Sequence, residues 1–209
     1  VGFTHPGQTE FIAERCGVSK NNAVMMLAGP DLRVVPMTTH IPLAEVAGKL
    51  DGRLIWQRLR ATAKGLQRNF GIENPRLAVA GFNPHAGEAG NMGREELDIF
   101  EPAIAQVRSE GFNVIGPLPA DTMFHAEARA QYDAALCAYH DQALIPLKTL
   151  YFHDAVNITL GLPVVRTSPD HGTAFGIAGQ NKALPHSMIA AIKMAESAAL
   201  HRLAAADLG

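Results

Sequence analysis

One glycine-rich segment limits the possible folds of this chain more than any other feature of its sequence. Residues 81–93 contain four glycines, follow a short apolar run at 77–80 and precede a helix-like pattern over 94–109. Glycine permits positive φ values and a close approach between backbone and ligand, and open α/β sheets bind ligands at the carboxyl ends of their strands. The segment therefore predicts an α/β fold with a ligand site after this strand. A solvent-exposed glycine loop with an incidental histidine is the alternative.

The spacing of apolar residues predicts alternating helices and strands along the rest of the chain. A spacing of three and four over 54–70 indicates a long amphipathic helix, and short apolar runs at 23–28 and 32–35 indicate an antiparallel hairpin. Further helices are expected at 9–16, from Pro42 onward, at 143–148 and at 187–203, and further strands at 112–115, 134–139, 155–160 and 163–166. This order predicts a largely parallel sheet with an antiparallel element near the start.

Length, charge and cysteine content restrict the class of protein. The 209 residues suit one large domain or two small ones, and a net charge of −2 gives no electrostatic footprint for nucleic acid. No apolar run approaches the roughly 20 residues of a membrane-spanning helix. Cys16 and Cys137 form no metal-type pair and are expected to be reduced, which favours a cytoplasmic protein without nucleic-acid or membrane partners. Because residues 2–9 resemble an active-site loop, we also expect the chain to lack an N-terminal portion.

Three of the nine histidines share a sequence context. His40, His85 and His140 each follow a strand-like run, and separations of 45 and 55 residues exclude a local finger-type site. Strand ends from different parts of one sheet can bring such residues together, and three imidazoles that leave one position open are typical of a catalytic divalent metal site. The spacing therefore indicates a metal site, and a hydrogen-bonded structural role for each histidine is the alternative.

A second group combines polar side chains with apolar surroundings. Lys148, Asn157 and Arg166 lie within or beside short apolar runs, where an unpaired cation would be costly. A phosphate or carboxylate ligand would supply the missing charge. The alternative is an internal salt bridge to Asp121, Asp154 or Asp170.

A turn of small residues at 170–174 indicates a nucleotide site. Asp170 is followed by His171, Gly172, Thr173 and Ala174, and a turn of this kind at the start of a helix permits close approach of a nucleotide. The chain contains no Gly-x-Gly-x-x-Gly fingerprint, so a Rossmann site is not supported.

Taken in order along the chain, these motifs closely resemble those of the 4-hydroxythreonine-4-phosphate dehydrogenase (PdxA) family of pyridoxal phosphate synthesis. The matching segments are 7–10, 38–40, 81–93, 116–121, 139–142, 157–163, 166–168 and 170–174. The resemblance implies the two-domain α/β/α architecture of isocitrate and isopropylmalate dehydrogenases, without the N-terminal part of a typical member.

The resemblance also implies roles for the residues singled out above. His40, His85 and His140 would be metal ligands, contributed across a homodimer interface with the third from the other subunit. The substrate would be held by Gln8, Thr9, Lys148, Asn157 and Arg166, and NAD by His171, Gly172, Thr173 and Ala174. Asp121 and Asp141 match acidic residues that line the site, and the acid/base is either Lys148 or Asp121.

The implied activity is the NAD-dependent oxidation of 4-phospho-hydroxythreonine at a CH–OH group, followed by loss of its carboxylate as carbon dioxide. A divalent metal would lower the pKa of the alcohol; zinc is the first candidate, and magnesium, cobalt and manganese are others. Gln8 stands where members commonly have histidine, which favours, as an alternative, a related dehydrogenase for threonate or erythronate phosphate or for a cis-diol carboxylate. A non-catalytic binding fragment is the alternative from a different class.

Overall fold

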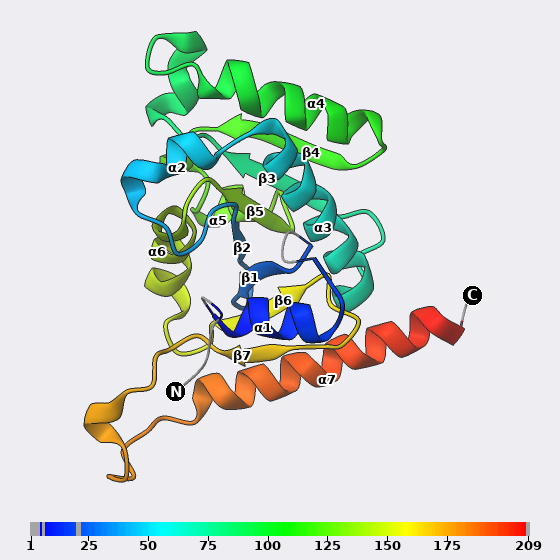
Figure 1. The fold of residues 1–209 in the computed structure, drawn as a ribbon, viewed down its shortest axis with the longest axis vertical. Coiled ribbons are helices and arrows are strands. Elements are labelled where there is room, and N and C mark those ends of the chain that lie inside the picture. The colour runs from blue at the N-terminus through cyan, green and yellow to red at the C-terminus, as the bar shows by residue number, and fades with distance from the viewer. Residues whose placement is uncertain (1–4, 6, 20–21, 208–209) are drawn as a thin grey trace.

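The computed structural model describes residue 5 and residues 7–19 and 22–207, and within them seven strands form one mixed sheet (Figure 1). The strand order is β4-β3-β5-β2-β1-β6-β7. The strands are β1 (Val24–Ala28), β2 (Arg33–Pro36), β3 (Arg76–Ala80), β4 (Asn113–Leu118), β5 (Ala134–Cys137), β6 (Val156–Leu160) and β7 (Thr167–Pro169). The predicted α/β fold is confirmed. Residues 2–4 and 6 of the predicted N-terminal loop lie outside the described residues.

The two halves of the sheet differ in strand direction. β4, β3, β5 and β2 run parallel, whereas β2, β1, β6 and β7 pair antiparallel. The hairpin of β1 and β2 is confirmed, but the prediction of a largely parallel sheet is wrong because β6 and β7 extend the antiparallel half. The strand predicted at 163–166 is displaced to β7, since Pro163 cannot donate a hydrogen bond to a sheet.

Helices cover both faces of the sheet. α2 (Leu43–Lys49), α3 (Gly52–Phe70) and α4 (Glu101–Ser109) pack on one face, and α5 (Ala126–Arg129) and α6 (His140–Tyr151) lie on the other. α1 (Gln8–Arg15) and α7 (His186–Asp207) flank the antiparallel half (Figure 1). The shorter turns are η1 (Pro84–Gly90), η2 (Glu96–Phe100), η3 (Ala120–Thr122) and η4 (Phe175–Ile177). In the described part of the chain, none of the helices combines the length and apolar character that crossing a bilayer requires.

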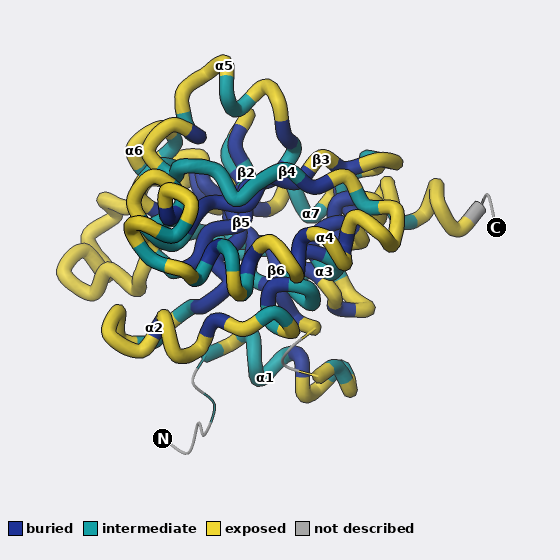
Figure 2. The backbone as a smooth tube through the Cα atoms, turned by 90° about the horizontal axis from the view of Figure 1, so that it is seen from above, coloured by how far each residue is buried: buried dark blue, intermediate teal, exposed yellow. Residues whose placement is uncertain are grey.

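Alternate residues of the central strand β5 pack into two different hydrophobic cores, one on each face of the sheet. Ala134 and Leu136 pack with α3 and α4, whereas Ala135 and Cys137 pack with α6. Successive side chains of a strand point to opposite faces, so a strand buried on both faces is a continuous apolar run. Figure 2 shows these central strands buried between helices whose outer turns are exposed. Burial also raises the pKa of the Cys137 thiol, and both cysteines are free.

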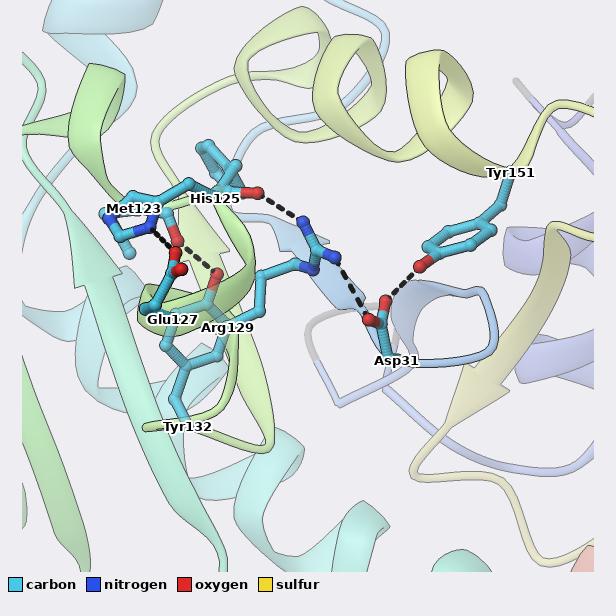
Figure 3. Close-up of polar contacts among 8 residues, drawn as sticks. Asp31, Met123, His125, Glu127, Arg129, Tyr132 and Tyr151 are labelled. Atoms are coloured by element: carbon cyan, nitrogen blue, oxygen red, sulfur yellow. Dashed lines mark hydrogen bonds and ion pairs between the residues drawn. The ribbon is translucent and has the colours of Figure 1, made fainter.

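A polar network ties the β1–β2 turn to the helices on one face of the sheet (Figure 3). Tyr151, the last residue of α6, donates a hydrogen bond to Asp31 Oδ1. Arg129 Nη2 donates to Asp31 Oδ2 over 3.0 Å, and Arg129 Nη1 donates to the carbonyl of Phe124 over 2.6 Å. The hydrogen bond from Tyr151 and then that from Arg129 lower the pKa of the Asp31 carboxyl.

We expect Asp31→Asn to make the free energy of unfolding less dependent on pH in the acid range. A carboxyl with a lowered folded-state pKa stabilises the fold fully above its unfolded pKa, near 3.8, and this contribution is lost as the pH falls through the folded-state value. The effect should stay below about 1 kcal/mol, because the Asp31 side chain is 55% exposed.

Urea unfolding at neutral and at acid pH measures this difference. Wild type should be more stable than Asp31→Asn at neutral pH, and the two should converge once the carboxyl is protonated. Asp154→Asn changes an exposed carboxyl outside the network and should follow the wild-type pH dependence. A stability difference that persists at acid pH would show that the ionised state of Asp31 is not its cause.

Candidate active site

A cavity of about 490 Å³ lies beside the carboxyl ends of β2 and β5 and the start of α1. Its volume falls within the range of small-molecule sites, about 300–1,000 Å³. Among the residues predicted from the sequence, its lining includes Gln8, Thr9, His40, His140, Asn157, Arg166, His171, Gly172 and Thr173. Ala174 directly follows Thr173 but is not part of the lining. The cavity therefore gathers predicted residues from distant parts of the sequence.

Pairing of two neighbouring strands brings His40 and His140 together. β2 and β5 are parallel, and just beyond them Thr38 Oγ1 donates a hydrogen bond to the carbonyl of Ala138 over 2.8 Å. Both segments then leave the sheet at the same edge. The centres of the two imidazole rings lie 5.4 Å apart, with the ring planes inclined by 48°.

Neighbouring side chains orient His140 at the start of α6. Its Nδ1 lies 2.7 Å from Asp141 Oδ1, which leaves Nε2 for a ligand. A carboxylate at one ring nitrogen fixes the tautomer and the orientation of the ring. Gln142 Oε1 accepts from the Ala138 amide over 2.7 Å, and Gln142 Nε2 donates to the Gly81 carbonyl over 2.8 Å. The start of α6 is thus fixed against the glycine-rich segment.

Two imidazoles at this separation suit one divalent metal ion. With metal–nitrogen bonds of about 2 Å, rings whose centres are 5.4 Å apart can both reach a common ion. The described residues include no cluster of three or more His, Cys, Asp or Glu side chains that could hold a metal ion. Of the three histidines predicted as metal ligands, His40 and His140 lie at this cavity, and their role as ligands stays a prediction.

His85 lies apart from the other two histidines. It belongs to η1, its side chain is 63% exposed, and its Nδ1 is 3.4 Å from Glu88 Oε2. It is not part of the cavity lining. The convergence of three strand ends expected from the spacing is thus seen for two of them. The contribution of a third ligand from another subunit stays a prediction.

The segment that carries His85 folds as a left-handed turn around a buried carboxylate. Residues 85–89 all have positive φ values, between 42° and 76°, which L-residues rarely adopt in succession. Glu96, only 1% exposed, accepts hydrogen bonds from the Asn83 amide over 2.7 Å and from Asn83 Nδ2 over 2.9 Å. A Cβ at Gly87 would lie 2.6 Å from Glu96 Oε2, so only glycine fits there.

The other end of the cavity offers a cation and a free acceptor. Arg166 Nη2 donates to Gln8 Oε1 over 3.3 Å and Nη1 donates to Thr159 Oγ1 over 3.2 Å. Burial lowers the pKa of Arg166, and no carboxylate of the described residues pairs with it. The buried Oδ1 of Asn157 has no hydrogen-bond partner among the same residues. This arrangement fits an anionic ligand that also carries a hydrogen-bond donor.

Lys148 has the internal partner that Arg166 lacks. Its Nζ lies 3.3 Å from Asp170 Oδ2 and donates to the Asp170 carbonyl over 3.4 Å. Burial raises the pKa of Asp170, and the charge of Lys148 opposes this rise. Lys148 also lines a more open depression next to the cavity, together with His140 and Asp141. The alternative of an internal salt bridge is therefore correct for Lys148.

One predicted residue lies away from the cavity, and others were not predicted. Asp121 is exposed on η3 and lines neither the cavity nor the depression beside it, so its catalytic role stays a prediction.

Arg58 of α3 lines the cavity but was not predicted from the sequence. Its Nε donates to the Met37 carbonyl over 3.3 Å, and burial lowers its pKa. One signal could have found it, because Arg58 follows Leu54 by one turn at the edge of the apolar stripe. Further lining residues absent from the predicted site are Glu10, Thr39 and Ser168.

Known proteins resemble this chain over nearly all of its length. The family model of the pyridoxal phosphate biosynthetic protein PdxA matches residues 1–195. A 4-hydroxythreonine-4-phosphate dehydrogenase from Zymomonas mobilis subsp. mobilis is 59% identical over 207 residues, which are 99% of this chain and 62% of that protein.

Solved structures agree with the sequence comparison. The crystal structure of 4-hydroxythreonine-4-phosphate dehydrogenase from Klebsiella pneumoniae matches with a TM-score of 0.85 and 43% identity, over 95% of this chain and 60% of that one. A terephthalate 1,2-cis-dihydrodiol dehydrogenase from Burkholderia xenovorans matches with a TM-score of 0.74 and 34% identity, over 91% of this chain and 60% of that one. The chain spans about three fifths of the length of these relatives.

Proposed function

Because the chain belongs to the PdxA family of pyridoxal phosphate biosynthetic proteins, we propose that it provides most of the active site of a metal- and NAD-dependent dehydrogenase. The proposed substrate is 4-phospho-hydroxythreonine, which is oxidised at a CH–OH group and then decarboxylated. One observation carries this proposal: the same cavity contains the paired imidazoles of His40 and His140 and the guanidinium of Arg166, which has no carboxylate partner among the described residues. A metal-type donor pair beside an anion site suits a phosphorylated hydroxy acid.

In this proposal His40 and His140 hold a divalent metal, with zinc as the first candidate because it commonly takes imidazole ligands. When bound, such an ion supplies a Lewis acid beside the alcohol to be oxidised. Asp141 holds Nδ1 of His140 so that Nε2 faces the ligand. The third imidazole is His85 of a second copy, since η1 exposes this side chain at the surface. A homodimer with a shared site follows from this assignment.

The substrate would be held by its charged end. Arg166 offers a two-pronged guanidinium to the phosphate, and Gln8 and Thr9 at the start of α1 add hydrogen bonds. Asn157 Oδ1, which lacks a partner among the described residues, accepts a hydrogen bond from a hydroxyl or ammonium group of the substrate. Residues 171–174 hold NAD at the rim of the same cavity.

Proton transfer is assigned to Lys148 together with Asp170, in preference to Asp121. The pair lies next to His140, whereas Asp121 is exposed on η3. Since burial raises the pKa of Asp170, its carboxylate can accept a proton from the Lys148 ammonium, and the neutral amine that results can then accept the proton of the alcohol.

A dehydrogenase for a different substrate is the second candidate, and one contact favours it. Gln8 places a neutral amide beside Arg166, 3.3 Å from Nη2, so the anion site has one cation fewer than a histidine there could provide. The relative from Burkholderia xenovorans is named for a terephthalate cis-dihydrodiol, a compound without phosphate. Threonate and erythronate 4-phosphates are the phosphorylated alternatives.

The test is NADH formation by the protein expressed from its complete gene, with Zn²⁺ or Mg²⁺ added. Rates with 4-phospho-hydroxythreonine, threonate 4-phosphate and erythronate 4-phosphate are compared, and the first should give the highest kcat/KM. Arg166→Gln should raise the KM of the preferred substrate about 10–100-fold, because hydrogen bonds to charged groups are strong. Arg53→Gln, an exposed arginine that lines no part of the cavity, should leave KM unchanged.

The outcomes separate the candidates. Preference for another acid would keep the fold and the chemistry but replace the proposed substrate. Absence of NADH formation with every substrate would overturn the dehydrogenase and favour the binding fragment.

A further inference from the structure

A second cavity concentrates positive charge on the opposite side of α3. It has a volume of about 440 Å³ and lies between α3 and α7, and we call it the α3–α7 groove. Arg60, Lys64 and Arg68 of α3 and Arg202 of α7 line it, and no Asp or Glu is among its described lining residues. It shares no lining residue with the candidate active site. The groove is therefore a separate feature of the molecule.

The spacing of the three α3 cations places them on one helix face. Arg60, Lys64 and Arg68 follow one another at intervals of four residues, so their side chains lie one above the other. Like charges at this spacing repel and destabilise a helix. The whole chain has a net charge of only −2, so the groove does not reflect a generally basic protein. Repulsion from Arg68, after the larger effect of burial, lowers the pKa of Arg202.

Among the residues that the structure describes, a carboxylate neutralises only one of these four cations. Arg60 Nε lies 3.0 Å from Glu110 Oε2, and its guanidinium stacks over Trp56 at 4.4 Å from the ring centre. Lys64 has no polar partner among the described residues, and the one side-chain hydrogen bond that Arg68 makes within them goes to the Leu162 carbonyl over 3.4 Å. Within the described part of the chain, Lys64 and Arg68 thus face the groove without a counter-charge.

Arg202 is held in place by uncharged acceptors. Its Nε donates to Asn69 Oδ1 over 2.7 Å, and its two Nη atoms donate to the carbonyls of Pro163 and Leu162 over 2.8 and 3.3 Å. These bonds fix the guanidinium without neutralising it. A group fixed before binding loses little conformational entropy when a ligand arrives.

We propose that the α3–α7 groove binds a small phosphorylated anion, such as a phosphate ester or a polyphosphate. A ligand with two or more negative charges neutralises Lys64 and Arg68 together and relieves their repulsion, whereas a single carboxylate leaves one of them unpaired. The volume of the groove suits a small molecule. Trp56 adds an apolar wall for the organic part of an ester.

The test uses the protein with inorganic pyrophosphate as the probe at low ionic strength. Trp56 is the only tryptophan of the chain and lines the groove, so its fluorescence reports on this site. Wild type should show a saturable change, and Lys64→Gln/Arg68→Gln should raise the dissociation constant at least about tenfold. Lys64→Gln alone is a second variant whose fold is not at risk, because Lys64 is exposed and has no polar partner among the described residues. This variant should raise the dissociation constant by a smaller factor.

Two controls locate the binding. Lys49→Gln/Arg53→Gln removes the same charge from exposed residues outside the groove and should leave the dissociation constant unchanged. Arg166→Gln weakens the candidate active site and should leave the fluorescence titration intact. Equal weakening by Lys49→Gln/Arg53→Gln, loss of the signal in Arg166→Gln, or no saturable binding by both fluorescence and calorimetry would each overturn the proposal.

Discussion

Replacement of His140 by alanine is expected to lower the affinity of the protein for Zn²⁺ by more than about 100-fold. Substitution of a residue that only orients a metal ligand lowers metal affinity about 10–100-fold. His140 is proposed to bind the ion directly, so its loss should have a larger effect. Its ring centre lies 5.4 Å from that of His40, so the remaining imidazole cannot replace it. Asp141→Asn should lower the Zn²⁺ affinity about tenfold, because the amide still contacts His140 Nδ1 but no longer carries the negative charge. Competition with a chelating indicator measures both affinities.

His153→Ala is the matched control for this experiment. His153 is exposed and lines neither the cavity nor the depression beside it, so its removal should leave zinc affinity unchanged. A comparable loss in His85→Ala would identify the third ligand. Wild-type affinity in His140→Ala would remove this residue from the metal site and, with it, the observation that carries the proposed function.

Glu96→Ala is expected to lower the free energy of unfolding by about 2–3 kcal/mol. The substitution removes a charged acceptor that is 1% exposed, and the Asn83 amide loses its partner. Hydrogen bonds to charged groups contribute about 1.5–3 kcal/mol, and an unsatisfied buried donor adds a penalty. The left-handed turn at 85–89 also loses the carboxylate around which it is packed. Urea unfolding followed by circular dichroism measures the change.

Two variants make this result specific. Glu101→Ala removes an exposed carboxylate at the start of α4 and should change stability by less than about 0.5 kcal/mol. Glu96→Gln keeps one acceptor oxygen, so its free energy of unfolding should lie between those of wild type and Glu96→Ala. Wild-type stability in Glu96→Ala would mean that the turn at 85–89 is held by other contacts.

Elements set by local sequence are the ones that the sequence predicts well. The spacing of apolar residues predicts a helix over 54–70, and α3 spans Gly52–Phe70. The earlier start follows from Asp51, whose carboxylate accepts a hydrogen bond from the Leu54 amide over 2.6 Å. Gly71 ends the helix with a φ of 65°. The β1–β2 hairpin is predicted for the same reason, since its turn residues adjoin both strands.

Features that depend on distant contacts are predicted less well. The direction of β6 is set by its pairing with β1, which no local pattern in either strand encodes. The left-handed turn at 85–89 contains a single glycine, Gly87, so composition does not indicate that its four neighbours also take positive φ. Residue types predict the proposed metal and anion groups, whereas the separation of His85 from His40 and His140 depends on the fold of η1.

The strand order of the sheet also determines how this protein can fold. The pairings of β1 with β6 and of β2 with β5 join residues roughly 100 or more positions apart. Non-local pairing slows folding, because long loops must close before their contacts are gained. During synthesis from the N-terminus, β1 and β2 are made well before β6 and β5, with which they also pair. Their apolar residues can therefore aggregate until β5 and β6 have been synthesised. Because its lining runs from Gly7 to Thr173, the candidate active site can be complete only after the antiparallel half of the sheet has formed.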